Sequence, residues 1–181
     1  MDDRAWRGVG CRGLGMKQTR VRLKPGRDKS LRRGHPWIFS GAIAQASGTP
    51  QSGETVCIES AEGDALALAA WSASSQIRAR VWSFATDTVI DAAFIHAQIE
   101  AAIALRTKLP ELAPTCTNAQ RLVHGESDGL PGLIVDRYAD TLVLQLSSAG
   151  ADARRDAIVA ILAVVVVLVI NPAELLHQAR D

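Results

Sequence analysis

Short runs of alternating apolar and polar residues follow one another through the first half of the chain. This alternation has the period of a half-buried β-strand. The runs predict strands over residues 19–23, 55–59, 65–70 and 76–82. Turn residues separate them: Lys24-Pro25-Gly26 follows the first run, and Glu62-Gly63-Asp64 joins the second and third as a hairpin. Several short strands divided by turns predict a small β-barrel or sandwich over residues 17–85.

A helical period replaces this alternation after residue 87. Ile95, Ile99 and Ile103 recur every four residues, which is the stripe of a helix that packs on a core, and the pattern predicts a helix over residues 91–109. An aspartate at its start can cap the helix and a proline behind it stops it. Three further strands and a second helix, opened by Asp152, complete the pattern. The three strands are predicted over residues 121–123, 133–138 and 142–146.

Residues 157–170 form an unbroken apolar run of 14. A membrane helix needs about 20 such residues, so we expect no stable membrane association, and a small membrane-attached protein is kept as an alternative. Residues 157–162 are expected to continue the helix. The β-branched residues 164–170 predict a buried strand.

The composition is that of a globular protein: of 181 residues, 48% are hydrophobic and 22% charged, with a net charge of +1. At about 100–150 residues per domain, the chain has room for one large or two small domains. Cys11, Cys57 and Cys116 are odd in number and far apart, which favours neither a disulfide framework nor a zinc cluster. We therefore expect a reducing, cytoplasmic location and no metal.

The near-neutral total hides a charge asymmetry. Residues 1–40 carry 11 Lys and Arg against 3 Asp and Glu, whereas residues 41–181 carry 9 against 16. A basic front end is typical of a surface that meets a polyanion; a solvated basic tail is the alternative. Residues 1–16 lack the apolar segment of a signal peptide. They are expected to be disordered or to precede the true start at Met16.

Two short motifs are weighed and set aside. Residues 8–13 match the GxGxxG pattern of dinucleotide sites, but neither the preceding strand nor the following helix is present. Residues 125–129 match the GxSxG elbow of hydrolases, but a strand follows in place of the required helix, and only His177 could serve as the base. The second motif is therefore expected to form a tight loop between strands.

A cluster of basic and aromatic residues over 29–39 is more informative. Arginine and lysine contact phosphates, and an exposed Trp or His can stack on an unpaired base. We expect Ile38 and Phe39 to lie inside the barrel. Two arginines that alternate with apolar residues on one strand extend the basic surface or are simply solvated. The candidate RNA-binding residues are Lys29, Arg32, Arg33, His35, Trp37, Arg78 and Arg80.

Two stretches carry a resemblance to a known family. Residues 20–44, RVRLKPGRDKSLRRGHPWIFSGAIA, resemble the start of the PUA RNA-binding domain in SAM-dependent ribosomal RNA methyltransferases. Residues 121–162, and most specifically GESDGLPGLIVDRY, resemble the central domain of the large-subunit cytosine-C5 methyltransferase I family. The similarity runs from about Met16 to Leu162.

The resemblance implies an α+β protein, with an N-terminal PUA-like β pseudobarrel followed by an incomplete small α+β domain. It divides the chain into residues 17–88, the PUA-like domain, residues 89–163, a helix plus the central domain, and residues 164–181, a divergent tail. It also implies S-adenosylmethionine (SAM) as cofactor of the full-length family, ribosomal RNA as partner, and a cysteine thiolate that attacks cytosine C6 so that C5 accepts the methyl group.

The chain departs from that family after Leu162. The family's catalytic cysteine, glycine-rich SAM loop and Asn/Asp-Pro-Pro motif lie downstream of the matched region, and Asn171-Pro172 is followed by alanine. We therefore predict the RNA-binding portion of a SAM-dependent ribosomal RNA methyltransferase, truncated before its SAM-binding domain. The chain alone is predicted to be inactive, with no catalytic residue and no bound cofactor. A stand-alone PUA-type RNA-binding protein is the alternative.

Overall fold

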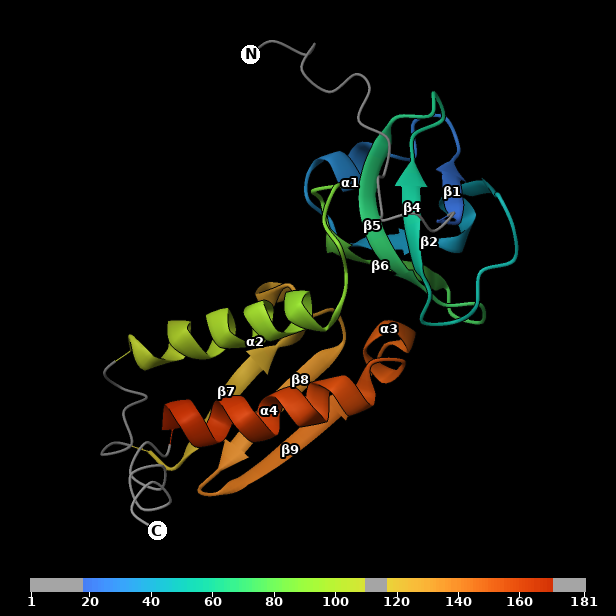
Figure 1. The fold of residues 1–181 in the computed structure, drawn as a ribbon. Helices are drawn as coiled ribbons and strands as arrows, with labels where there is room; N and C mark the ends of the chain where they lie inside the picture. Colours follow the sequence, from blue (N-terminus) through green and yellow to red (C-terminus); the bar gives the residue numbers. More distant parts are fainter. Residues whose placement is uncertain (1–17, 110–116, 171–181) are drawn as a thin grey trace.

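The computed structural model describes residues 18–109 and 117–170, with side chains up to residue 165. A curled sheet forms the first part of the described chain, and two long helices on a smaller sheet form the second (Figure 1). The first part contains β1 (Arg20–Leu23), α1 (Lys29–Arg32), β2 (Trp37–Phe39), the 3₁₀ turn η1 (Ser40–Ala42), β3 (Ile43–Ala46), β4 (Thr55–Glu59), β5 (Ala65–Trp71) and β6 (Ile77–Ser83). The second contains α2 (Ala92–Thr107), β7 (Ala119–His124), the 3₁₀ turn η3 (Gly125–Asp128), β8 (Leu133–Tyr138), β9 (Thr141–Leu146), α3 (Ala149–Asp152) and α4 (Arg155–Ile170).

The first sheet has six strands in the order β2-β6-β5-β4-β1-β3. β1 and β4 pair in parallel, and every other pair in this sheet is antiparallel. Alternate residues of each strand therefore point into one interior, where Val21, Ile58 and Ala69 are fully buried. The α+β class and the predicted small β-barrel are confirmed.

Three elements of the barrel were not predicted: α1, β2 and β3, which have only 4, 3 and 4 residues. Runs this short carry too little periodicity to be recognised. β2 also corrects one expectation. Ile38 is buried, but Phe39 is 49% exposed, because neighbouring residues of a strand face opposite sides of the sheet.

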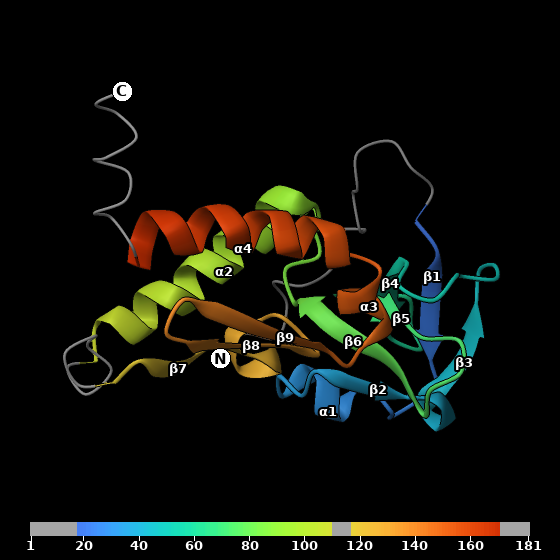
Figure 2. The same ribbon diagram turned by 90° about the horizontal axis from the view of Figure 1, so that it is seen from below.

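The second sheet is an antiparallel meander, β7-β8-β9. The helices α2 and α4 lie side by side on one of its faces (Figure 2). Ile95, Ile99 and Ile103 are buried between α2 and that sheet, as the four-residue period predicted. Asp91 caps α2 by accepting a hydrogen bond from the Phe94 backbone N–H at 2.9 Å.

The prediction of a strand over residues 164–170 is wrong, because α4 continues as a helix to Ile170. Ile158, Leu162 and Val165 are buried at helical spacing in the core shared with α2, and this packing outweighs the modest strand preference of valine. The helix also begins later than expected: α3 ends at Asp152, and α4 starts at Arg155. None of the helices in the described ranges has the length and apolar character needed to cross a membrane.

The GxSxG stretch forms the turn η3 between β7 and β8, so it is a loop between strands, as expected. Cys57 is buried in β4 and takes part in a disulfide bond, which the wide spacing of the cysteines did not indicate. Sequence spacing could not reveal this bond, because a disulfide depends on the separation of two cysteines in the fold. The GxGxxG stretch, residues 1–16, His177 and Asn171-Pro172 lie outside the described residues.

Candidate nucleic-acid interface

The basic segment around α1 contains both free and neutralised cations. Lys29 and Arg33 are exposed, and neither forms an ion pair within the described ranges. Arg32 differs, because its Nε lies 2.5 Å from the Asp28 carboxylate and its Nη2 lies 3.8 Å from Asp64. The hydrogen bond from Arg32 lowers the pKa of Asp28, so this pair stays ionised and Arg32 offers less net charge to a partner.

Trp37 is held on three sides. Its Nε1 donates a hydrogen bond to Glu126 Oε1 at 2.7 Å. The guanidinium of Arg80 lies over its ring, 5.0 Å from the centroid, and the His35 ring meets it edge-on at 5.7 Å. The Trp37 backbone N–H also donates to His35 Nδ1 at 3.2 Å. His35 and Arg80 therefore orient Trp37, a residue that remains 37% exposed.

Glu126 joins the second part of the chain to the barrel. It belongs to η3, yet its Oε1 accepts from Arg80 Nη1 at 2.5 Å as well as from Trp37. Burial raises the pKa of Glu126, but the hydrogen bonds from Trp37 and Arg80, together with the Arg80 charge, leave that pKa below its ordinary value. We call the contact between the barrel and the second part the joint. Because Glu126 neutralises Arg80, the charge of this arginine stabilises the joint and is less available to an outside anion.

Arg78 and Arg80 share one face of β6, as their alternation predicted, but their neighbours differ. Arg78 lies over the Trp71 ring at 5.6 Å from the centroid. It also donates to the carbonyl oxygens of Ser72, at 3.2 Å, and of Ala73. These contacts hold the Arg78 side chain against the loop that joins β5 to β6.

A second group of contacts fixes the barrel to the region of α3. Arg154 lies over the Trp82 ring, 5.1 Å from the centroid, and donates to Thr55 Oγ1 at 2.7 Å and to the Gly53 carbonyl at 3.1 Å. Burial lowers the pKa of Arg154. The backbones approach closely at Gly150 and at Gly53: an added Cβ atom would lie 2.4 Å from the Ala70 Cβ in the first case and 2.4 Å from the Ala153 Cβ in the second. The two parts of the chain are therefore in direct contact around α3.

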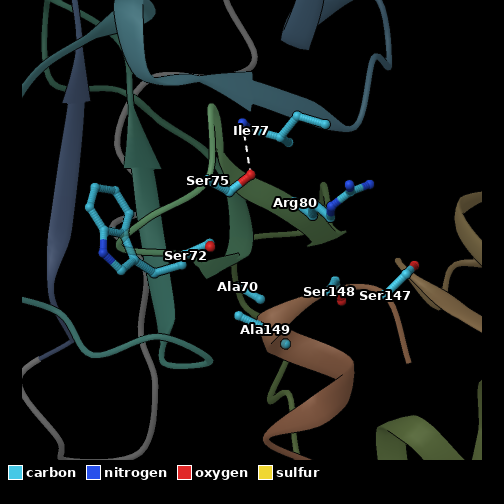
Figure 3. A pocket seen from close by; sticks show the side chains of 10 residues that line it. Ala70, Ser72, Ser75, Ile77, Arg80, Ser147, Ser148 and Ala149 are labelled. Carbon is cyan, nitrogen blue, oxygen red and sulfur yellow. Dashed lines mark hydrogen bonds between the residues drawn. The ribbon is translucent and has the colours of Figure 1, made fainter. Parts of the chain in front are cut away.

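A small cleft lies along this joint, lined by residues of β5, β6 and the start of α3 (Figure 3). Its volume is about 50 Å³, which is room for water but not for a cofactor. Several of its hydroxyls already have partners: Ser75 accepts from the Ile77 N–H at 3.1 Å, and Ser148 donates to the Pro131 carbonyl at 2.7 Å. The cleft is part of the joint.

The GESDG segment has a structural role at both of its acidic residues. Glu126 contacts the barrel, and Asp128 accepts two hydrogen bonds from Arg106 of α2, at 2.7 Å each. Asp128 also accepts from the His124 backbone N–H at 2.6 Å. Sequence reasoning weighed this motif as a catalytic serine loop or a tight turn. It missed Glu126 and Arg154 as residues of the joint, and it missed the pair of Arg106 with Asp128 inside the second part. The described part of the chain contains no group of three or more His, Cys, Asp or Glu suited to a metal ion.

Comparison with known proteins finds a family that is similar to the barrel. Residues 21–84 match the PUA-like domain family. The chain is 50% identical over 141 residues to the ribosomal RNA large subunit methyltransferase I of Erwinia tasmaniensis, a match that covers 78% of this chain and 35% of that protein. It is 47% identical over 144 residues to the protein of the same name from Shewanella amazonensis, covering 80% and 36%.

A solved structure supports the same architecture. A Streptococcus mutans chain, described as a SAM-dependent methyltransferase, superposes with a TM-score of 0.68 over 81% of this chain and 37% of its own length. Its sequence identity is 18%, so this likeness concerns the fold. The chain thus spans about a third of the length of the proteins that it matches.

Proposed function

We propose that this chain is the RNA-binding portion of a SAM-dependent ribosomal RNA methyltransferase that forms 5-methylcytosine in the large-subunit RNA. The observation that carries the proposal is the 50% identity to a large-subunit methyltransferase, which extends over both the barrel and the GESDG joint. The PUA-like match over residues 21–84 supports RNA as the ligand of the barrel. A ribosomal RNA substrate would place the protein in the cytoplasm.

Exposed cations supply the binding energy in this proposal. Lys29 and Arg33 project from the α1 segment without ion pairs in the described ranges, so both can neutralise phosphates and release counterions. Arg32 contributes less, because Asp28 and Asp64 already offset its charge.

SAM itself has no suitable site in the described residues. A class I methyl donor, as the resemblance implies, sits where a glycine-rich turn joins a strand to a helix in a doubly wound sheet. Within the described ranges the helices α2 and α4 do not follow such a turn, and the sheet beneath them is an antiparallel meander. These residues do not fit the cofactor, and we derive no catalytic step through it.

The test is a binding titration of the full chain with a fragment of large-subunit ribosomal RNA at several salt concentrations. Replacing Lys29 and Arg33 together by glutamine should reduce the slope of log Kd against log salt by about 1.4–1.8, since each phosphate contact contributes about 0.7–0.9. Arg121→Gln is the matched control, because Arg121 is an exposed arginine paired with Asp136 on the second sheet. An unchanged slope in the double variant would refute this interface.

A stand-alone PUA-type RNA-binding protein is the second candidate, supported by the match of residues 21–84 to the PUA-like domain family. The two proposals differ in selectivity. A methyltransferase portion should prefer large-subunit ribosomal RNA to a transfer RNA at equal salt, whereas a general binder should bind both alike. Incubation of the chain with labelled SAM and that RNA should transfer no methyl group; transfer would show that the chain alone holds a methyl-donor site.

A further inference from the structure

The strand β9 forms one edge of the second sheet, and no strand of the described ranges pairs with its outer side. Its six residues pair with β8 in a continuous register, and none of them is charged, proline or glycine. A regular edge strand presents a row of backbone N–H and C=O groups with which another strand can pair. Folded proteins commonly protect such an edge with a bulge, a charged side chain or a very short strand.

The other edge strands of the two described sheets have this protection. β2 and β3, at the edges of the first sheet, have only 3 and 4 residues, and each has an irregular register with its neighbour. β7 has six residues, but its register with β8 shifts between Arg121 and Val123, and Arg121 adds a charge. Among the edges that the structure describes, β9 is therefore the one whose form favours pairing with a further strand.

The helix α4 adds an exposed apolar surface beside this edge. On the sheet, α2 lies on the side of β7 and α4 on the side of β9 (Figures 1 and 2). Residues 157–165 of α4 contain no polar side chain, and Val159 and Val164 are 50% and 55% exposed. A helix that is apolar on all sides is normally buried. The leucines of β9 are also only partly buried against the core of the second part, namely Leu142, Leu144 and Leu146.

We infer that β9 and the exposed side of α4 form a self-association surface, in which β9 of a second copy of this chain continues the sheet. A second copy fits by charge, because its own β9 is uncharged, so the new strand pair buries no unpaired charge and opposes no like charges. The same symmetric contact brings the apolar side of α4 to the interface in both copies. Nucleic acid does not fit this edge, because β9 offers no cation to a phosphate. The inference goes beyond the proposed RNA binding and does not depend on it.

Sedimentation velocity of the full chain over a range of concentrations tests this surface. The wild type should convert reversibly from monomer to dimer as the concentration rises. Val143→Lys combined with Gln145→Lys should weaken dimerisation about tenfold or more, because lysines of both copies would then meet at the new strand pair. Both positions are exposed, so the fold should tolerate the change. The matched control is Ala44→Lys combined with Gln45→Lys, which adds the same charge at exposed positions of the β3 edge and should leave dimerisation unchanged.

Hydrogen exchange of the wild type locates the interface without any substitution. At a concentration that favours the dimer, the outward backbone N–H groups of β9 should exchange more slowly than in dilute solution, whereas those of β7, at the opposite edge, should exchange at an unchanged rate. A wild type that stays monomeric at every concentration would overturn the inference and leave this edge to a strand of another protein. A dimer that the β9 lysines do not weaken, that the control weakens equally, or that slows no β9 exchange would overturn it as well.

Discussion

Substituting Gly150 by alanine tests whether the two parts of the chain are locked together. The residue lies in α3, and the added Cβ would meet the Ala70 Cβ at 2.4 Å and a ring carbon of Trp82 at 2.9 Å. Carbon atoms in contact normally stay about 3.5–4.0 Å apart, so α3 and β5 would have to separate by more than about 1 Å.

Two effects of this substitution oppose each other. Alanine favours a helix over glycine by about 0.5–1 kcal/mol, and the backbone at Gly150 has no positive φ that would strain it. Overpacking of a filled site costs about 1–3 kcal/mol. The neighbours here are a strand Cβ and a ring held under Arg154, and neither can rotate away. Overpacking should therefore prevail, with a net loss of about 1–2 kcal/mol.

Urea unfolding followed by tryptophan fluorescence measures this loss as a lower midpoint at an unchanged slope. Gly48→Ala is the matched control, because a Cβ at Gly48 meets no atom within 4 Å, and its midpoint should stay equal or rise slightly. Adding Ala70→Gly to Gly150→Ala removes the closest contact, so the pair should be coupled by about 1 kcal/mol. A Gly150→Ala midpoint at or above that of the wild type would refute the locked joint.

Three further outcomes follow from the same contacts. Arg106→Gln should cost about 3 kcal/mol in urea unfolding, because it leaves the buried Asp128 carboxylate without its cation, and a loss below about 1 kcal/mol would contradict this role. Arg121→Gln, which opens the more exposed pair with Asp136, should leave the urea midpoint nearly unchanged, and a shift as large as that of Arg106→Gln would contradict this. The pKa of Glu126 lies below the ordinary 4.5 in the folded chain, so its contribution to stability is present above that pH and is lost as the pH falls through the lower folded value. Glu126→Gln should therefore flatten the acid limb of a plot of unfolding free energy against pH, and an unchanged limb would exclude Glu126 as its source.

The sequence could predict those elements whose signal is local. The isoleucines of α2 report burial within a single element, and the structure confirms them. The predicted strands β4, β5 and β6 are present too, but burial in β4 and β5 does not alternate, because four consecutive residues of each are buried. The parallel pairing of β1 with β4 could not be predicted, because it joins residues 37 apart, such as Arg20 and Cys57. The valine run misled the prediction, since the core of α2 and α4 decides its conformation.

The candidate site likewise contains residues that the sequence could predict and contacts that it could not. The cations of α1 were visible as a cluster, and even the neutralisation of Arg32 by Asp28 could have been predicted from their four-residue spacing. The contact of Arg80 with Glu126 spans 46 residues and joins two parts of the fold. No pattern along the chain indicates it, because the two partners become neighbours only after the barrel and the second sheet have packed.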